Sequence, residues 1–73
     1  TMTRQDWLEA FARELGADAP SPEEQAAVLE LAAEAAHGSE RTAAPIAAWM
    51  AGRAGRPLSE VLDVARRATG EAG

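Results

Sequence analysis

The stretch His37-Gly38-Ser39-Glu40-Arg41-Thr42-Ala43-Ala44-Pro45 lies between two alanine-rich segments and indicates how the chain divides into helices. Glycine is a poor helix former because its backbone loses more conformational freedom than that of other residues, so Gly38 is expected to end one helix. Proline suits the start of a helix and disfavours the helical conformation of the residue before it. The next helix is therefore predicted to start at Pro45, with Ala44 as its boundary.

Further helix signals lie on both sides of this stretch. Thr3 and Asp6 form a T-x-x-D cap, and Ser21-Pro22-Glu23-Glu24 combines a capping serine, an early proline and a capping-box glutamate. No segment alternates polar and apolar residues as a strand would. The predicted fold is all-α, a compact bundle in a single domain over residues 1–73, with residues 1–2 as an N-terminal remnant and 70–73 as a frayed tail. Four short helices are predicted, at about 3–15, 22–37, 45–54 and 58–69.

Apolar spacing predicts which helix faces are buried. Trp7, Leu8, Phe11 and Leu15 form one stripe, so the first helix is expected to anchor the core. In the second helix the inward face is expected to include Val28, Leu29 and Leu31, together with several alanines, and Glu34 is placed on the outer face. In the third helix Arg53 follows Trp49 by four residues, a spacing that favours a cation–π contact.

Composition limits the classes of function. Only 73 residues are available, and most of the hydrophobic residues, 47% of the chain, are alanine, so the core must be thin. There is no cysteine to add a disulfide. A homodimer could compensate for the thin core, because it would bury apolar surface against a second chain. The net charge of −5 argues against nucleic acid as a partner, and no apolar run is long enough to span a membrane. We expect a cytoplasmic protein without a cofactor or metal.

The loop between the second and third helices is the main candidate site. Ala44 has no side-chain oxygen to cap the third helix, so Glu40 or Thr42 is expected to fold back, or an anion to bind beside Arg41. A second cluster could form if a hairpin of the third and fourth helices brings Arg41, Arg53 and Arg56 together. The candidate binding residues are His37, Ser39, Glu40, Arg41, Thr42, Arg53 and Arg56.

Enzymatic explanations find little support. His37 and Ser39 could form the core of a hydrolase, but no third group or oxyanion hole accompanies them. A metal site at His37 would have only Glu34 and Glu40 as further ligands. The stretch Gly52-Arg53-Ala54-Gly55 matches the G-x-x-G loop of nucleic-acid-binding KH domains, which also require a sheet, so a helix terminator is preferred. No catalytic residue is assigned.

Three segments taken together, Asp6-Trp7, residues 37–46 and residues 51–56, resemble a small actinobacterial family of unknown function. Its pattern is an early tryptophan, then His-x-Ser-Glu-Arg-x-Ala-Ala-Pro, then Ala-Gly-Arg. Gly38 and Pro57 occupy positions where more variable residues are expected. Members stand alone or extend molybdenum-cofactor guanylyltransferase-like proteins at the C-terminus. The resemblance implies a link to molybdopterin guanine dinucleotide synthesis and such an enzyme as partner, and it assigns no activity. The matching residues are Trp7, His37, Ser39, Glu40, Arg41, Pro45, Gly52 and Arg53.

Three functions follow from these observations, and an enzyme ranks below them. The first is a non-catalytic protein-interaction or regulatory module, with its contact surface at the 37–42 loop and the Arg53–Arg56 turn. The second is a small anion- or nucleotide-binding domain, with its site at the start of the third helix. The third is a purely structural dimerisation domain.

Overall fold

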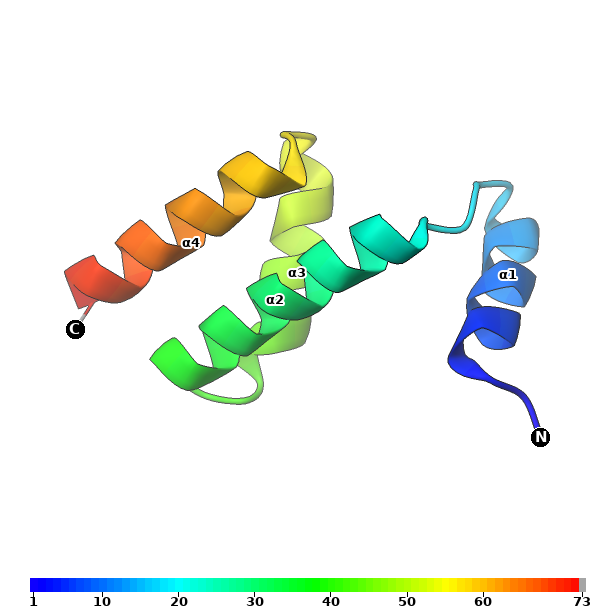
Figure 1. Ribbon diagram of the computed structural model, residues 1–73, viewed down its shortest axis with the longest axis horizontal. Helices are drawn as coiled ribbons and strands as arrows, with labels where there is room; N and C mark the ends of the chain where they lie inside the picture. Colours follow the sequence, from blue (N-terminus) through cyan, green and yellow to red (C-terminus); the bar gives the residue numbers. More distant parts are fainter. Residues whose placement is uncertain (73) are drawn as a thin grey trace.

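The computed structural model describes residues 1–72, which form four helices and no strand. The helices are α1 (Arg4–Leu15), α2 (Pro22–Gly38), α3 (Ala43–Ala54) and α4 (Leu58–Ala72) (Figure 1). The predicted all-α class and the number of helices are confirmed. Both predicted capping boxes are present: the Asp6 N–H donates to Thr3 Oγ1 at 3.1 Å, and the Glu24 N–H donates to Ser21 Oγ at 3.1 Å.

Helix α2 is the centre of the packed part of the molecule. Both α3 and α4 pack along it, and they contact each other only slightly. In Figure 1, α2 and α4 run in the same direction and α3 runs back across them, behind α2. Leu31 of α2 is the most buried large side chain among the residues described, with 4% of its surface exposed. The core is therefore a single layer of aliphatic contacts on the two sides of α2.

Helix α1 stands apart from the other three helices (Figure 1). Its aromatic face remains open to solvent, with Trp7 54% and Phe11 47% exposed, and only Ala12 is buried within it. The expectation that α1 anchors the core is thus wrong. Gly16, at φ 73°, ends the helix, and a short connection carries α1 beyond the N-terminal end of α2. The stripe is amphipathic as predicted, but nothing in residues 1–72 covers it.

Several local predictions need correction. Helix α3 begins at Ala43, two residues before Pro45, because the Glu40 and Arg41 carbonyls accept hydrogen bonds from the Ala43 and Ala44 N–H groups and start the turn early. Helix α4 continues through residues 70–72, part of the expected frayed tail, and residue 73 lies outside the described residues. Leu29, expected in the core, is 51% exposed.

Candidate functional site: an apolar groove between α3 and α4

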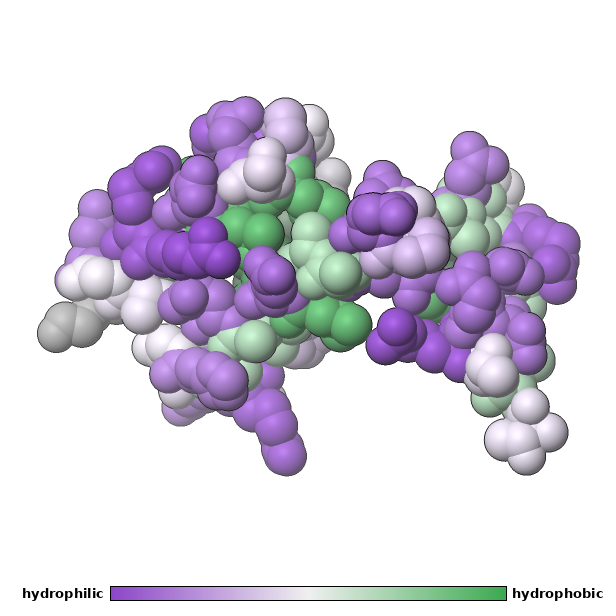
Figure 2. Space-filling view, viewed as in Figure 1, coloured by the Kyte–Doolittle hydropathy of each residue, from purple (hydrophilic) through white to green (hydrophobic). Residues whose placement is uncertain are grey.

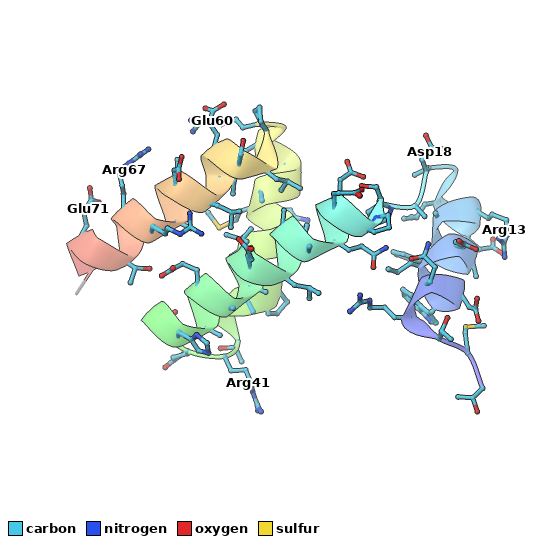
Figure 3. The ribbon with its side chains drawn as sticks, viewed as in Figure 1. Arg13, Asp18, Arg41, Glu60, Arg67 and Glu71 are labelled. Atoms are coloured by element: carbon cyan, nitrogen blue, oxygen red, sulfur yellow. The ribbon has the colours of Figure 1, made fainter. Side chains whose placement is uncertain are left out.

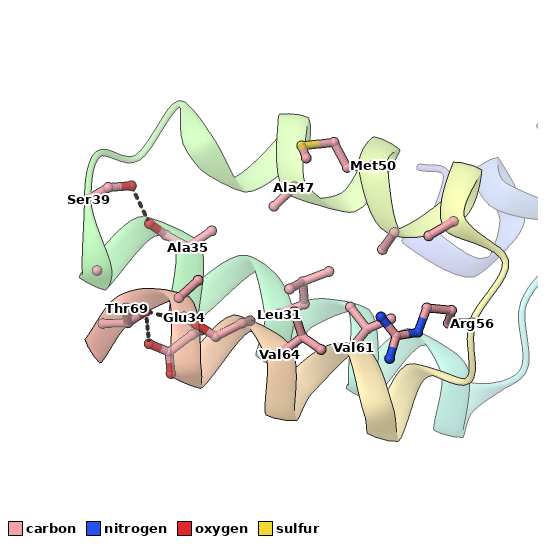
Figure 4. A pocket seen from close by; sticks show the side chains of 15 residues that line it. Leu31, Glu34, Ala35, Ser39, Ala47, Met50, Arg56, Val61, Val64 and Thr69 are labelled. Carbon is pink, nitrogen blue, oxygen red and sulfur yellow. Dashed lines mark hydrogen bonds between the residues drawn. The ribbon is translucent and has the colours of Figure 1, made fainter. Parts of the chain in front are cut away.

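Because α3 and α4 both pack on α2 but barely on each other, an open groove runs between them. Its volume is about 440 Å³, within the range of ligand-binding pockets. Figure 4 shows Leu31 at its floor, Ala47 and Met50 projecting from α3, and Val61 and Val64 on the α4 side. Alanines of all three helices add to the apolar lining: Ala35 of α2, Ala51 and Ala54 of α3, and Ala65 and Ala68 of α4. Small and aliphatic side chains thus form most of its surface.

The polar side chains of the groove already have partners within the chain. The Ser39 hydroxyl donates to the Ala35 carbonyl at 2.7 Å, and the Thr69 hydroxyl lies 2.7 Å from Glu34 Oε2 (Figure 4). Arg56 Nη2 lies 2.6 Å from Glu60 Oε1. Glu34 is expected on the outer face of α2, but the hydrogen bond that it accepts from Thr69 turns it toward α4. Since few polar groups are left to orient a polar ligand, the groove suits an apolar occupant.

The predicted binding residues divide between the two ends of α3. His37, Glu40, Arg41 and Thr42 lie at the connection from α2, where Figure 3 shows Arg41 projecting away from the molecule. Arg53 and Arg56 lie at the other end of α3, which is about 18 Å long at 1.5 Å per residue. The structure therefore does not bring all three arginines into one cluster. Of the seven candidates, only Ser39 and Arg56 line the groove.

The start of α3 offers little to an anion. The Thr42 side chain does not cap α3. The absence of this cap agrees with the anion hypothesis, which requires free N–H groups at the helix start. However, the Ala43 N–H donates to the Glu40 carbonyl at 2.9 Å and the Ala44 N–H to the Arg41 carbonyl at 3.1 Å, while Pro45 has no N–H. Three of the four backbone positions that normally lack partners at a helix start are thus accounted for. Anion binding there stays a prediction that depends mainly on Arg41.

The arrangement around His37 does not favour catalysis. The Ser39 hydroxyl hydrogen is directed to the Ala35 carbonyl, whereas a nucleophilic serine donates to its base. Within residues 1–72 no three His, Asp or Glu side chains are placed to hold a metal ion. The arginine at the other end of α3 behaves as expected, because the Arg53 guanidinium carbon lies 4.9 Å from the Trp49 ring centroid. That cation–π prediction is confirmed.

The sequence pattern did not reveal the groove residues. Met50, Val61, Val64 and Thr69 come from two helices, and helical periodicity marks faces without indicating that two such faces remain apart. The one feature of the sequence that indicates such a surface is that it has more large apolar side chains than so small a core can bury. Figure 2 shows hydrophobic residues gathered over the middle of the molecule, between α2 and α4, with hydrophilic residues around them. The exposed large side chains also include Ile46, Trp49 and Met50 of α3, each about 60% exposed.

Fold and site together define a small all-α domain with an open apolar groove and a detached amphipathic helix. The chain belongs to the family described as domain of unknown function DUF6457, whose model matches residues 1–72. No curated protein and no solved structure matches the chain. Over the part that the structure describes, no helix has both the length and the apolar character needed to cross a membrane.

Proposed function

We propose that this domain is a non-catalytic protein-interaction module that binds an apolar helix in the groove between α3 and α4. The observation that carries the proposal is the groove itself, which has an aliphatic lining and polar side chains that already have hydrogen-bond partners within the chain. Two helices form its walls and a third its floor. An amphipathic partner helix is the usual ligand of such a surface, because its apolar side chains enter the groove while its polar side remains in water.

The sequence resemblance supports a particular partner class. In the family that the sequence resembles, the domain extends a molybdenum-cofactor guanylyltransferase in some actinobacterial proteins. Where domain and enzyme are separate chains, we expect the domain to bind the enzyme. The domain would then regulate or position molybdopterin guanine dinucleotide synthesis without taking part in the chemistry. Ser39 lines one end of the groove, so the 37–42 loop of the resemblance borders the proposed docking surface.

The test measures binding of a separately expressed molybdenum-cofactor guanylyltransferase by isothermal titration calorimetry. Met50→Glu places a carboxylate in the groove at a side chain that is 59% exposed, so the fold should tolerate it. Ala33→Glu makes the same charge change at an exposed residue of α2 outside the groove. Burying an unpaired carboxylate is costly, so Met50→Glu should weaken binding at least about tenfold. Ala33→Glu should leave it unchanged.

Two outcomes would contradict the proposal. One is equal binding by the wild type and the Met50→Glu variant, which would place the contact elsewhere. The other is equal weakening by Met50→Glu and Ala33→Glu, which would indicate a general charge effect rather than occupation of the groove. Circular dichroism of each variant confirms that its helix content is retained.

A further inference from the structure

We infer that one occupant of the groove is α1 of a second copy of this chain, so that each of two chains places its first helix in the groove of the other in a reciprocal homodimer. This inference rests on the proposed function, because it names a ligand for the same groove. In a two-fold dimer each chain supplies one helix and one groove, and both contacts form at once. The structure supports this occupant through the state of α1, the dimensions of the groove and the total exposed surface.

Helix α1 lacks the support that a helix of its length needs. It has 12 residues, and isolated helices this short are marginal in water, so most helical stability in proteins comes from packing an apolar face. The face of α1 is nevertheless open: Trp7 and Phe11 stack on each other with ring centroids 4.9 Å apart, and Leu15 is 63% exposed. A surface outside its own chain would provide the missing contact.

The groove and the apolar stripe of α1 agree in length. Trp7, Phe11 and Leu15 are four residues apart, so the stripe extends about 12 Å along the helix at 1.5 Å per residue. The floor of the groove runs from Leu31 to Ser39 and its α4 wall from Val61 to Thr69, which also gives about 12 Å on each side. Large apolar side chains on successive turns of one helix face are the anchors in helix-in-groove recognition.

The exposed surface is larger than a folded monomer of this mass normally presents. The scaling of accessible area with mass gives about 4300 Å² for 7.6 kDa, whereas the chain exposes 5588 Å², a surplus of about 1300 Å². An ordinary stable interface removes about 800 Å² from each partner. The surplus is therefore large enough to supply a dimer interface on each chain.

Within one chain, α1 is held away from the groove. The buried Gln25 side chain donates to Gln5 Oε1 at 2.8 Å and to the Pro20 carbonyl at 3.2 Å, which fixes α1 beyond the N-terminal end of α2. The groove lies along the C-terminal half of α2, from Leu31 to Gly38. Closing α1 onto its own groove would break these bonds. A second chain can supply α1 with both bonds intact.

The test is sedimentation equilibrium across about 1 μM to 1 mM, a range that covers moderate and weak association. The wild type should show a concentration-dependent dimer. Because buried aromatic anchors dominate such interfaces, Trp7→Ala/Phe11→Ala should raise the dissociation constant at least about thirtyfold. Met50→Glu should raise it at least about tenfold, and the Ala33→Glu control should not change it. A monomeric wild type over the whole range would overturn the inference.

A mixing experiment distinguishes this inference from the proposed function. The α1 double variant and Met50→Glu each lose both contacts, but a mixture of the two restores one intact α1 in one intact groove, so mixed dimers should form more tightly than either variant alone. If Met50→Glu dissociates the dimer and the α1 double variant does not, the occupant is a different segment and the inference fails. The proposed function survives that result. Binding of the guanylyltransferase to the α1 double variant, in which the groove is free, tests it separately.

Discussion

At the scale of single residues, Gly38 fixes the closest approach of α2 and α4. A Cβ at this position would lie 2.8 Å from Thr69 Oγ1 and 3.1 Å from Thr69 Cγ2. Rotation of the threonine cannot relieve both contacts, because one γ atom or the other stays near the new methyl group. The same threonine donates to Glu34 Oε2 at the end of the groove. Gly38 thus keeps two helices near enough for that bond to form.

We expect Gly38→Ala to lower the free energy of unfolding by about 1–3 kcal/mol, the usual cost of adding a methyl group to a packed contact. Gly52 provides the matched control, since nothing lies within 4 Å of a Cβ built there and alanine is the better helix former. Gly52→Ala should therefore raise the free energy of unfolding by up to about 1 kcal/mol. Urea denaturation of both variants measures the difference. A Gly38→Ala variant as stable as the wild type, or more stable, would show that the contact with Thr69 is unimportant.

At the scale of helices, the ends were far easier to predict from sequence than the packing. The T-x-x-D and Ser-Pro-Glu-Glu patterns predicted the starts of α1 and α2, since a cap acts on backbone groups within one turn. Gly16 and Gly55 both adopt the left-handed conformation expected of helix terminators. Helix caps and terminators depend only on neighbouring residues, so they can be predicted without knowing the rest of the fold.

Packing partners could not be predicted in the same way. The stripe of Trp7, Phe11 and Leu15 indicates that α1 has a face to bury, but periodicity does not indicate against what, and the structure leaves that face open. Alanine on two sides of α3 likewise permits contact with either neighbour. The groove exists because α3 and α4 both pack on α2 rather than on each other. Which long-range contacts form cannot be predicted from helical spacing.

The attachment of α1 yields a prediction at this scale. Gln25→Ala removes the bonds to Gln5 and Pro20, each worth about 1 kcal/mol, so α1 should detach more often, by about fivefold for each bond lost. Hydrogen exchange of the monomer, at low micromolar concentration, should become faster in residues 4–15 and stay unchanged in α2–α4. Gln5→Ala, which removes only one of the bonds, should have the smaller effect. Faster exchange throughout α2–α4 would mean that Gln25 supports the whole domain.

At the scale of the whole molecule, charge and apolar surface have opposing effects on association. Each chain carries a net charge of −5, so a dimer of two chains carries −10, and the two copies repel each other at long range. Surface ion pairs, such as that of Arg66 with Glu30 at 3.7 Å, are exposed and contribute little to stability. In the dimer inferred above, burial of apolar area must therefore provide the driving force.

Salt dependence tests that balance. Raising sodium chloride from about 50 mM to about 500 mM shortens the screening length to a few ångströms, which weakens repulsion between the like-charged copies and leaves apolar burial intact. We expect the dimer dissociation constant, measured by sedimentation equilibrium, to fall with added salt. A guanidinium-to-carboxylate interface would show the opposite trend, since screening removes its attraction. A dissociation constant that rises about tenfold across this range would therefore contradict an apolar contact between α1 and the groove and indicate that the arginines hold the two chains together.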